Sequence, residues 1–288
     1  MTPRVIAVLS HARPGETEVA FVQLLAQARE RGVLVRVDAD EAAKHGLTAR
    51  DGVEIGDDAF GDVELAIALG GDGTVLRALR RFAGTKVPVF GINYGEIGFL
   101  ATVDRDRAEE GVASALAGEF ESIRLPSIRP HDGAWSSGAF GDNAINDVAI
   151  TRRAGDRVAE LAYAVGGEEV GRVRCDGLVV ATPAGSTGYN LANGGPVLAW
   201  GVEGFVVSFI APHSLTARAL VVAPDDVRTV HNRSADPVDV SLDGRPTGEL
   251  APGETITCAF HRDAAELALL PGSTFYRRLH ETFGRLSS

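Results

Sequence analysis

Lysine is scarce in this chain, since only Lys44 and Lys86 among its 28 basic residues are lysines. Lys44 follows Ala43 and Lys86 follows Thr85, so neither residue can complete the Gly-Lys step of a Walker A loop. The Val-Ala-Ile-Lys element of protein kinases is missing as well. The scarcity of lysine therefore excludes P-loop nucleotide hydrolases and protein kinases.

Cysteine is equally scarce, and Cys175 and Cys258 have no partner at the spacing of a zinc knuckle or a redox Cys-x-x-Cys pair. We expect both to be reduced thiols in a cytoplasmic protein. The histidines form no His-Glu-x-x-His pattern and no Gly-x-Ser-x-Gly elbow occurs, which disfavours zinc proteases and α/β-hydrolases. The apolar run Val5–Leu9 is too short for a signal-peptide core or a membrane span, and it predicts a first strand.

Basic residues are also outnumbered, because 39 acidic residues against 28 basic ones leave a formal charge of −11. This balance argues against nucleic acid or an anionic membrane as a partner, and it requires local arginines wherever an anionic ligand binds. The 288 residues are 45% hydrophobic, which is enough to form one large domain or two modest ones.

The first part of the chain alternates short apolar runs with helical patterns, as expected for a parallel sheet covered by helices. Glu16–Arg31 is predicted to be a helix whose buried stripe contains Val19, Val22, Leu25 and Ala26. Further strands are expected at 33–37, 65–69 and 87–90. A helix ending near Gly118 is expected to begin with a capping box formed by Asp106 and Glu109.

From residue 123 onward the apolar segments become short and β-branched or alternating, which predicts a mostly β domain. Strands are expected at 144–151, 161–165, 177–181, 205–210, 238–242 and 255–260. Pro126 and Pro130 mark the crossing between two packed domains, and residues 274–283 return to a helical spacing. We therefore predict an α/β domain at 1–122, a β-rich domain at 123–270 and a C-terminal helix at 271–288 that packs back on the first domain.

Residues Gly70–Thr74 read Gly-Gly-Asp-Gly-Thr and lie between a predicted strand and a predicted helix. Glycines let the backbone approach a ligand closely, and the start of the helix offers free N–H groups to a phosphate. Asp72, held among these groups, can accept a proton from a hydroxyl; alternatively, it merely caps the helix, and the spacing does not choose between these interpretations. A Rossmann dehydrogenase is disfavoured because Leu76 stands where the third glycine of the dinucleotide fingerprint belongs.

Three further segments have the composition of ligand-binding loops. Gly91–Leu100 is glycine-rich and follows a strand, and its Asn93 orients a neighbouring carboxylate or ligand, or else serves as a turn residue. Asp176–Pro196 runs from a strand into glycines and hydroxyl residues, with Tyr189 available to stack on a base. Asn146 and Asp147 lie within an apolar segment, where their polar groups need either ligand hydroxyls or neighbouring strands as partners.

Together with Ala-Pro-His-Ser-Leu at 211–215 and Leu-Asp-Gly at 242–244, these segments resemble the NAD kinase family in content, order and spacing. The match spans Val63–Gly244. The Gly-Gly-Asp-Gly string alone is shared with diacylglycerol and sphingosine kinases and with phosphofructokinases. The resemblance implies an N-terminal Rossmann-like α/β domain, a C-terminal all-β domain that binds NAD, and an active site between them.

The resemblance also implies a reaction, namely phosphorylation of the 2′-hydroxyl of the adenosine ribose of NAD to give NADP. ATP or polyphosphate is the expected donor, with a divalent metal, Mg²⁺ in our expectation, and no metal-ligating residue is assigned. Asp72 matches the general base and Asp176 matches an Asp that reaches NAD near a subunit boundary, so a homo-oligomer, a dimer or a tetramer, is expected. The implied NAD-binding residues are Asp72, Gly73, Arg77, Asn146, Asp147, Arg157, Arg174, Asp176, Thr187, Gly188, Tyr189, Asn190, Leu191, Ala192 and Arg245.

The resemblance places residues 187–192 in the loop on the adenine side of NAD, called here the adenine-side loop. The chain departs from the family pattern at three positions in or near this loop. Gly188 stands where Ala is usual, a change that we expect to be tolerated. Ala184 replaces a common Thr and Ala192 a common Ser, which removes hydroxyl hydrogen bonds typically worth ~1 kcal/mol each. We expect these changes to weaken NAD binding without altering the reaction.

Two other functions compete with this assignment. A lipid kinase of the same superfamily would need a basic or apolar membrane-facing surface, and this acidic chain has no basic run. A non-catalytic sensor of NAD or NADP would share the binding loops, but the retention of Asp72 with the other matching elements argues for activity. A phosphofructokinase would continue with further α/β units where this chain reads as β.

Overall fold

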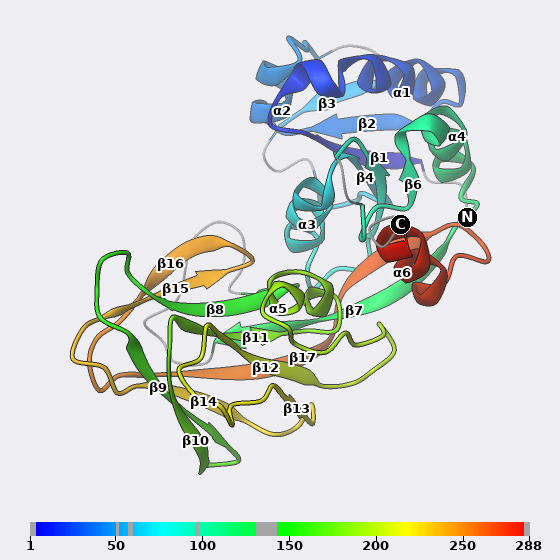
Figure 1. Cartoon of the computed structure of the whole chain (residues 1–288). Coiled ribbons are helices and arrows are strands. Elements are labelled where there is room, and N and C mark those ends of the chain that lie inside the picture. The colour runs from blue at the N-terminus through cyan, green and yellow to red at the C-terminus, as the bar shows by residue number, and fades with distance from the viewer. Residues whose placement is uncertain (1–3, 50–51, 57–59, 96–97, 131–142, 285–288) are drawn as a thin grey trace. The chain divides into compact units, whose positions relative to one another are not determined.

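The computed structural model describes residues 4–49, 52–56, 60–95, 98–130 and 143–284 (Figure 1). Glu96 and Ile97, which belong to the second glycine-rich segment, lie outside the described residues. The chain divides into two compact units. Unit 1 contains residues 1–124 and 265–288, and unit 2 contains residues 125–264.

Unit 1 is built on a parallel sheet with the strand order β17-β5-β4-β1-β2-β3, and β6 pairs with the end of β5. The strands are β1 (Val5–Ser10), β2 (Leu34–Val37), β3 (Val53–Ile55), β4 (Leu65–Gly70), β5 (Pro88–Asn93), β6 (Val103–Asp104) and the end of β17 (Thr255–Leu269). The helices are α1 (Glu18–Glu30), α2 (Ala39–Lys44), α3 (Asp72–Arg81), α4 (Ala108–Ala117) and α6 (Phe275–Gly284). β1, β4 and β5 are continuous apolar runs because helices cover both faces of the sheet.

The two faces of this sheet can be told apart at β5. Phe90 and Ile92 join the core that α1 and α4 form with one face. Gly91, between them, points to the other face, where a Cβ would lie 2.7 Å from the Cγ2 of Val75 in α3. Glycine at position 91 therefore permits the close approach of α3, the helix that begins with Asp72.

Two details of unit 1 differ from the sequence-based predictions. In α1 the buried residues are Ala20, Phe21, Leu24 and Ala28, whereas Val19 and Val22 are 73% and 61% exposed, so the predicted stripe faces the wrong way. The single aromatic residue of this helix, Phe21, selects the buried face, since its ring contributes the largest apolar area. The predicted capping box is also wrong, because the N-cap of α4 is Arg107 without a side-chain hydrogen bond; its C-cap, Gly118, has the left-handed conformation (φ 72°) typical of a helix end.

Unit 2 contains two antiparallel sheets. One has the strand order β13-β12-β11-β8-β15-β16, and the other contains β10, β9, β14 and the first part of β17, with β7 paired to β17. Their bounds are β7 (Glu121–Pro130), β8 (Asp147–Arg152), β9 (Ala159–Val165), β10 (Glu168–Cys175), β11 (Gly177–Ala181), β12 (Phe205–Ile210), β13 (Leu220–Val222), β14 (Arg228–Asn232), β15 (Val238–Leu242) and β16 (Arg245–Leu250). Side chains of both sheets share one core that includes Val148, Leu178, Leu161 and Ile256, as in a β-sandwich.

The outer face of the first of these sheets is covered by a segment without strands. Ala149, Val179 and Ala181 point away from the shared core and pack against Leu198. The segment between β11 and Leu198 contains the short helix α5 (Tyr189–Ala192). The loop that the sequence singled out is therefore held on the sheet by its own apolar contacts.

The predicted fold class is confirmed: a parallel α/β unit is combined with an antiparallel β unit, and the last helix belongs to the first unit. Pro126 and Pro130 are part of the strand β7. β17 is much longer than the predicted segment 255–260, because it continues from unit 2 into the parallel sheet, where Leu267 pairs with Val89.

Candidate active site

Asp72 is the first residue of α3, directly after β4. Its carboxylate does not cap the helix, since the N-cap is Gly71 and no side-chain cap hydrogen bond forms. Instead, Oδ2 accepts the backbone N–H of Phe99 and Oδ1 that of Leu100, each at 2.9 Å. The capping interpretation of Asp72 is therefore wrong, and the carboxylate is fixed by the loop that follows β5.

Two opposing effects set the protonation of Asp72. Burial raises the pKa of its carboxyl above the ordinary value, whereas the two backbone hydrogen bonds and the positive charge of Arg278 lower it. Burial is the largest of these effects, and a carboxylate with a raised pKa is a stronger base than one in water. Each of its oxygens has a second lone pair that can accept a proton from a hydroxyl.

Arg278 of α6 acts on the same loop. Its Nη1 donates to the carbonyl oxygens of Phe99, at 3.1 Å, and Ala101, and the side chain is buried. The ring of Phe99 also contacts Phe275 and Phe283, with ring centroids 5.6 and 6.2 Å apart. Arg278 is not among the residues predicted from the sequence, although an arginine within the amphipathic pattern 274–283 is a signal for it.

Asn93 ends β5 and ties two neighbouring segments together. Its Oδ1 accepts the N–H of Gly95 at 2.9 Å, and its Nδ2 donates to Oδ1 of Asp104 at 3.2 Å. The side chain thus orients a neighbouring carboxylate, as one interpretation proposed, and it also supports the turn. No left-handed backbone is involved, since the described residues other than glycine with positive φ are Ala211, Asp243 and Asp263.

Arg77, an expected NAD-binding residue, contacts another part of unit 1. Its Nη2 donates to Oε1 of Glu41 and to the carbonyl oxygen of Ser10, both at 2.7 Å. Glu41 is buried and also accepts from the Ser10 hydroxyl and from Lys44, at 2.6 and 2.9 Å. The Ser10 hydroxyl lies 2.7 Å from Nε2 of His45. Arg77 therefore joins α3 to the carboxyl end of β1 and to α2.

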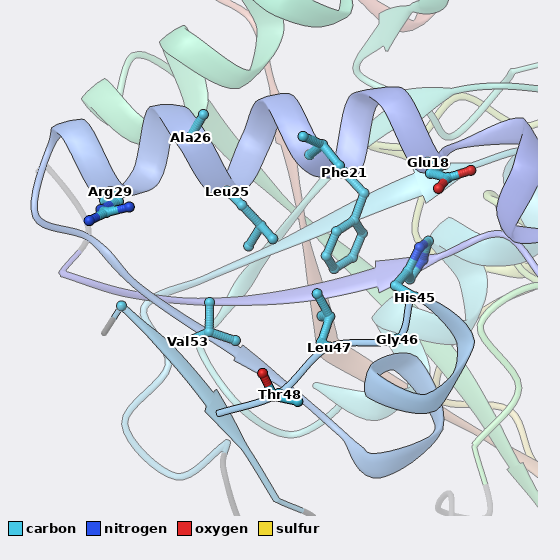
Figure 2. Close-up of a pocket in the computed structure, with 12 residues that line it drawn as sticks. Glu18, Phe21, Leu25, Ala26, Arg29, His45, Gly46, Leu47, Thr48 and Val53 are labelled. Carbon is cyan, nitrogen blue, oxygen red and sulfur yellow. The ribbon is translucent and has the colours of Figure 1, made fainter. Parts of the chain in front are cut away.

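A pocket of about 590 Å³ opens beside this cluster, between α1 and the chain that follows α2 (Figure 2). Phe21 and Leu47 form its apolar wall, while Arg29 lies at one end and Glu18 and His45 lie at the other (Figure 2). The rings of Phe21 and His45 stack at 4.2 Å, and burial lowers the pKa of His45. None of the described residues predicted to bind NAD lines this pocket.

In unit 2, Asn146 and Asp147 stand at the start of β8, beneath the hairpin turn between β15 and β16. The carboxylate of Asp243, in that turn, accepts the backbone N–H groups of Ile145, Asn146 and Asp147 at 3.1, 2.7 and 3.2 Å. Burial and the negative charge of Asp243 raise the pKa of Asp147 to about 7. The side-chain oxygen of Asn146 is buried and has no protein hydrogen-bond partner.

The loop after β11 packs directly on this pair. The Thr182 hydroxyl donates to the carbonyl oxygen of Ile145 at 2.6 Å, and the N–H of Thr182 donates to that of Asn146 at 2.8 Å. A Cβ on Gly185 would lie 2.0 Å from the Asn146 carbonyl oxygen, so only glycine fits there. Asn190 is fully buried, and its Nδ2 donates to the carbonyl oxygens of Ser186 and Pro196 at 2.9 and 3.0 Å.

The remaining expected residues of this loop differ in exposure. Tyr189 is 41% exposed, and the pKa of its hydroxyl is raised by burial and by the charges of Asp147 and Asp176. The Thr187 hydroxyl donates to the carbonyl oxygen of Ala184 at 3.0 Å. Gly188 and Ala192 are exposed, and Leu191 is half-buried. Unit 2 thus brings Asn146, Asp147 and the loop 187–192 together.

The expected arginines of unit 2 are placed in different ways. Arg245 follows the Asp243 turn, and its Nε and Nη2 atoms are buried with no protein hydrogen-bond partner. Arg174 on β10 and Arg157 in the turn between β8 and β9 are exposed. Asp176 accepts from Nε of Arg152 at 2.6 Å, and this bond lowers the pKa of Asp176. Arg245 therefore has unused donors beside the residues predicted to hold NAD.

Within the described ranges no three His, Cys, Asp or Glu side chains converge as a metal site. No helix in the same part of the chain is long and apolar enough to cross a membrane.

Comparisons with known proteins cover both units. The family model of the ATP-NAD kinase N-terminal domain matches residues 26–120, and that of the ATP-NAD kinase C-terminal domain matches residues 145–268. The NAD kinase of Symbiobacterium thermophilum is 37% identical over 77% of this chain and 79% of its own length. The NAD kinase of Gemmatimonas aurantiaca is 34% identical over 77% of this chain and 78% of its own.

Solved structures resemble the chain over nearly its whole length. An NAD kinase from Archaeoglobus fulgidus in complex with ATP superposes with a TM-score of 0.68 at 25% identity, covering 98% of both chains. Yeast NADH kinase complexed with NADH superposes with a TM-score of 0.85 at 23% identity, covering all of this chain and 89% of the yeast chain. The second likeness shows the fold alone.

Proposed function

Since the chain belongs to the NAD kinase family and acts as an NAD kinase, a phosphotransferase that makes NADP from NAD, we propose that Asp72 is the general base of this reaction. The single observation that carries the proposal is the fixation of both carboxylate oxygens by the N–H groups of Phe99 and Leu100. A carboxylate held in this way orients the 2′-hydroxyl of the adenosine ribose and takes its proton as the phosphoryl group arrives. Burial, which raises the pKa of Asp72, increases its basicity.

Asn146 and Asp147 are proposed to hold the NAD nucleoside. The unpartnered, buried side-chain oxygen of Asn146 is an acceptor that needs a donor, and ribose hydroxyls are donors of suitable size. The loop Thr187–Ala192 is proposed to line the adenine side, with Tyr189 available to stack on the base. Arg245, Arg174 and Arg157 are proposed to meet the pyrophosphate charges, and the unused buried donors of Arg245 support its role most directly.

The phosphate donor is ATP or polyphosphate, and we propose that Mg²⁺ accompanies it. Mg²⁺ is usually held by one or two carboxylates and by substrate phosphates instead of an all-protein cage. The described part of the chain contains no cluster of three possible ligands, and the metal is proposed to arrive with the phosphate donor.

We further propose a cytoplasmic homo-oligomer, either a dimer or a tetramer. Cys175 and Cys258 are buried and are not joined in a disulfide, which suits a reducing compartment. Asp176 is proposed to reach NAD near the boundary with a second copy of the chain. Light scattering during gel filtration measures the number of copies directly.

An end-point assay tests the proposed function. The purified protein is mixed with NAD, Mg²⁺ and either ATP or polyphosphate, and NADP is detected with a coupled NADP-specific dehydrogenase. We expect NADP to form with the wild-type protein. The amount of NADP formed by Asp72→Asn should be much smaller. Saturable NAD binding without NADP formation would favour a sensor, whereas a fully active Asp72→Asn protein would remove the base role while leaving the kinase intact.

A further inference from the structure

The peptide group between Phe99 and Leu100 is hydrogen-bonded at both ends to charged side chains. Its carbonyl oxygen accepts Nη1 of Arg278 at 3.1 Å, and its N–H donates to Oδ1 of Asp72 at 2.9 Å. Because the carbonyl and N–H of a trans peptide point in opposite directions, the three groups form one chain, from cation through peptide to carboxylate. Such chains of hydrogen bonds polarise one another, so the arginine strengthens the N–H bond to Asp72.

Other contacts fix the ends of this chain. Arg278 also donates to the carbonyl oxygen of Ala101, so its guanidinium spans two carbonyls of the same loop. The ring of Phe99 is held by Phe275 and Phe283 from the same helix α6. A planar guanidinium with several donors in a rigid fork suits this task better than a lysine ammonium does. Residues of α6 thus hold the loop through two of its carbonyl oxygens and through the ring of Phe99. The N–H groups of Phe99 and Leu100 are left to donate to Asp72.

We propose that Arg278 is a positioning residue of the kinase reaction, acting on Asp72 through the Phe99–Leu100 peptide group. This inference rests on the proposed function, because it requires Asp72 to be the base. Arg278 is 8% exposed, and it donates two hydrogen bonds to carbonyl oxygens of the loop whose N–H groups fix the carboxylate. The last helix of the chain is in this way part of the catalytic apparatus, although it carries no residue that matches the family motifs.

Charge adds a second effect to positioning. The acidic groups that act on Arg278 are Asp72, Asp104 from β6 and Glu281 from α6 itself. The positive charge of Arg278 in turn lowers the pKa of Asp72, against the larger effect of burial. Removing this charge leaves burial less opposed, so the carboxyl retains its proton to a higher pH.

The test compares Arg278→Gln, which removes the charge but keeps an amide donor, with Arg278→Lys, which keeps the charge. The control is Arg277→Gln, the same substitution at the exposed neighbouring position of α6. For each variant, kcat and KM for NAD are measured from pH 5.5 to 9, together with the melting temperature. Should Arg278→Gln not fold, Arg278→Met takes its place, because it buries no polar group.

We expect Arg278→Gln to lower kcat by roughly tenfold or more, with little change in KM for NAD, and to move the acid limb of the kcat profile upward by about one pH unit. Arg278→Lys should leave the acid limb in place and recover part of kcat, and Arg277→Gln should match the wild type. A folded Arg278→Gln protein with an unmoved acid limb would overturn the proposal, because a purely structural arginine affects stability alone.

A double variant separates this inference from the assignment of Asp72. If Arg278 acts through Asp72, Asp72→Asn with Arg278→Gln should be no slower than Asp72→Asn alone. Additive losses in the double variant would show that Arg278 acts elsewhere. An active Asp72→Asn single variant would instead remove the base itself, whatever the result at Arg278.

Discussion

The carboxylate of Asp243 accepts the backbone N–H of Asp147 at 3.2 Å while repelling the carboxyl group of the same residue. The hydrogen bonds from residues 145–147 hold Asp243 in place, so the two like charges cannot separate. Burial of Asp147, which is 6% exposed, adds to the repulsion. The result is a carboxyl with a pKa of about 7 among the residues proposed to hold NAD.

The affinity for NAD should therefore depend on pH around neutrality. Asp147 accepts hydrogen bonds from ligand hydroxyls best as a carboxylate, and this form gains population as the pH rises through about 7. Calorimetric titration with NAD at pH 6 and pH 8 should give tighter binding at pH 8. Asp147→Asn should bind more weakly and lose this dependence, and a wild-type affinity that is flat across the range would contradict the assignment.

Asp147→Asn should also stabilise the fold at high pH. Because the folded pKa of Asp147 is raised above its ordinary value of 3.8, the folded protein retains a proton that the unfolded chain has lost, and its free energy of unfolding falls as the pH rises from 4 to 7. In the wild type this fall in the free energy of unfolding has a limiting slope of about 1.4 kcal/mol per pH unit. In Asp147→Asn, which has no carboxyl group at this position, the fall is absent. Urea unfolding at pH 5 and pH 8 should show an advantage for the variant that grows with pH; equal curves at pH 8 would refute it.

Asp72→Asn should reduce turnover while sparing NAD binding. General base catalysis is typically worth ~10²- to 10⁴-fold, and the amide keeps an oxygen that can accept one of the two backbone N–H bonds. We expect kcat to fall by about that factor and the Kd for NAD to stay close to that of the wild type. The measurement is single-turnover kinetics beside calorimetry, and a large loss of NAD binding would indicate a structural role instead.

Substitution by alanine should affect NAD binding differently at two glycines that follow β11. A Cβ at Gly185 would lie 2.0 Å from the carbonyl oxygen of Asn146, which would push the loop away from Asn146 and Asp147, the pair proposed to hold NAD. At Gly188 the nearest atom would lie at 3.4 Å, an ordinary van der Waals contact, and the backbone (φ −96°, ψ −125°) is outside the left-handed region. We expect Gly185→Ala to weaken NAD binding by about tenfold or more, as for strain of about 1.4 kcal/mol or more, while Gly188→Ala has a much smaller effect. Equal affinities would show that the loop is not part of the site.

Arg174→Ala should weaken NAD binding. A charge-assisted contact is typically worth ~1.5 to 3 kcal/mol, which corresponds to a Kd about 10- to 150-fold higher. Arg172 is the matched control, because it lies two residues earlier on the same strand, is also exposed and pairs with Glu160. If Arg172→Ala and Arg174→Ala had the same Kd for NAD, the loss would reflect net charge and not a specific contact.

The hydrophobic pattern predicted secondary-structure elements well where only one periodicity, that of a strand or that of a helix face, fits the apolar residues. β11, β12 and β15 have the predicted bounds, because apolar runs in the first two and strict apolar–polar alternation in the third, each ended by turn residues, determine strands. The face of α1 was wrong, since valines at two positions follow the helical period as well as the buried residues do. Only the packing of Phe21 against the sheet distinguishes the two faces.

Long-range pairing limited the prediction of the site. Gly-Gly-Asp-Gly pointed to Asp72, but the partners of its carboxylate lie 27 and 28 residues away, and the arginine that supports them lies in the last helix. The buried contacts of Glu41 could not be predicted for the same reason, because its partners Ser10 and Arg77 are distant in the chain. Local patterns identify the residue that performs the chemistry, whereas the groups that orient it are determined by tertiary contacts.

The discontinuity of unit 1 has a consequence for how the protein is made. Its parallel sheet gains the end of β17, and Asp72 gains the support of α6, from residues after 264, whereas unit 2 is one unbroken stretch of chain. During translation the ribosome therefore delivers all of unit 2 before unit 1 can be completed. A nascent chain that already carries Asp72, Asn146 and residues 187–192 still lacks α6, so premature release would leave the loop that holds the proposed base without the support of Arg278.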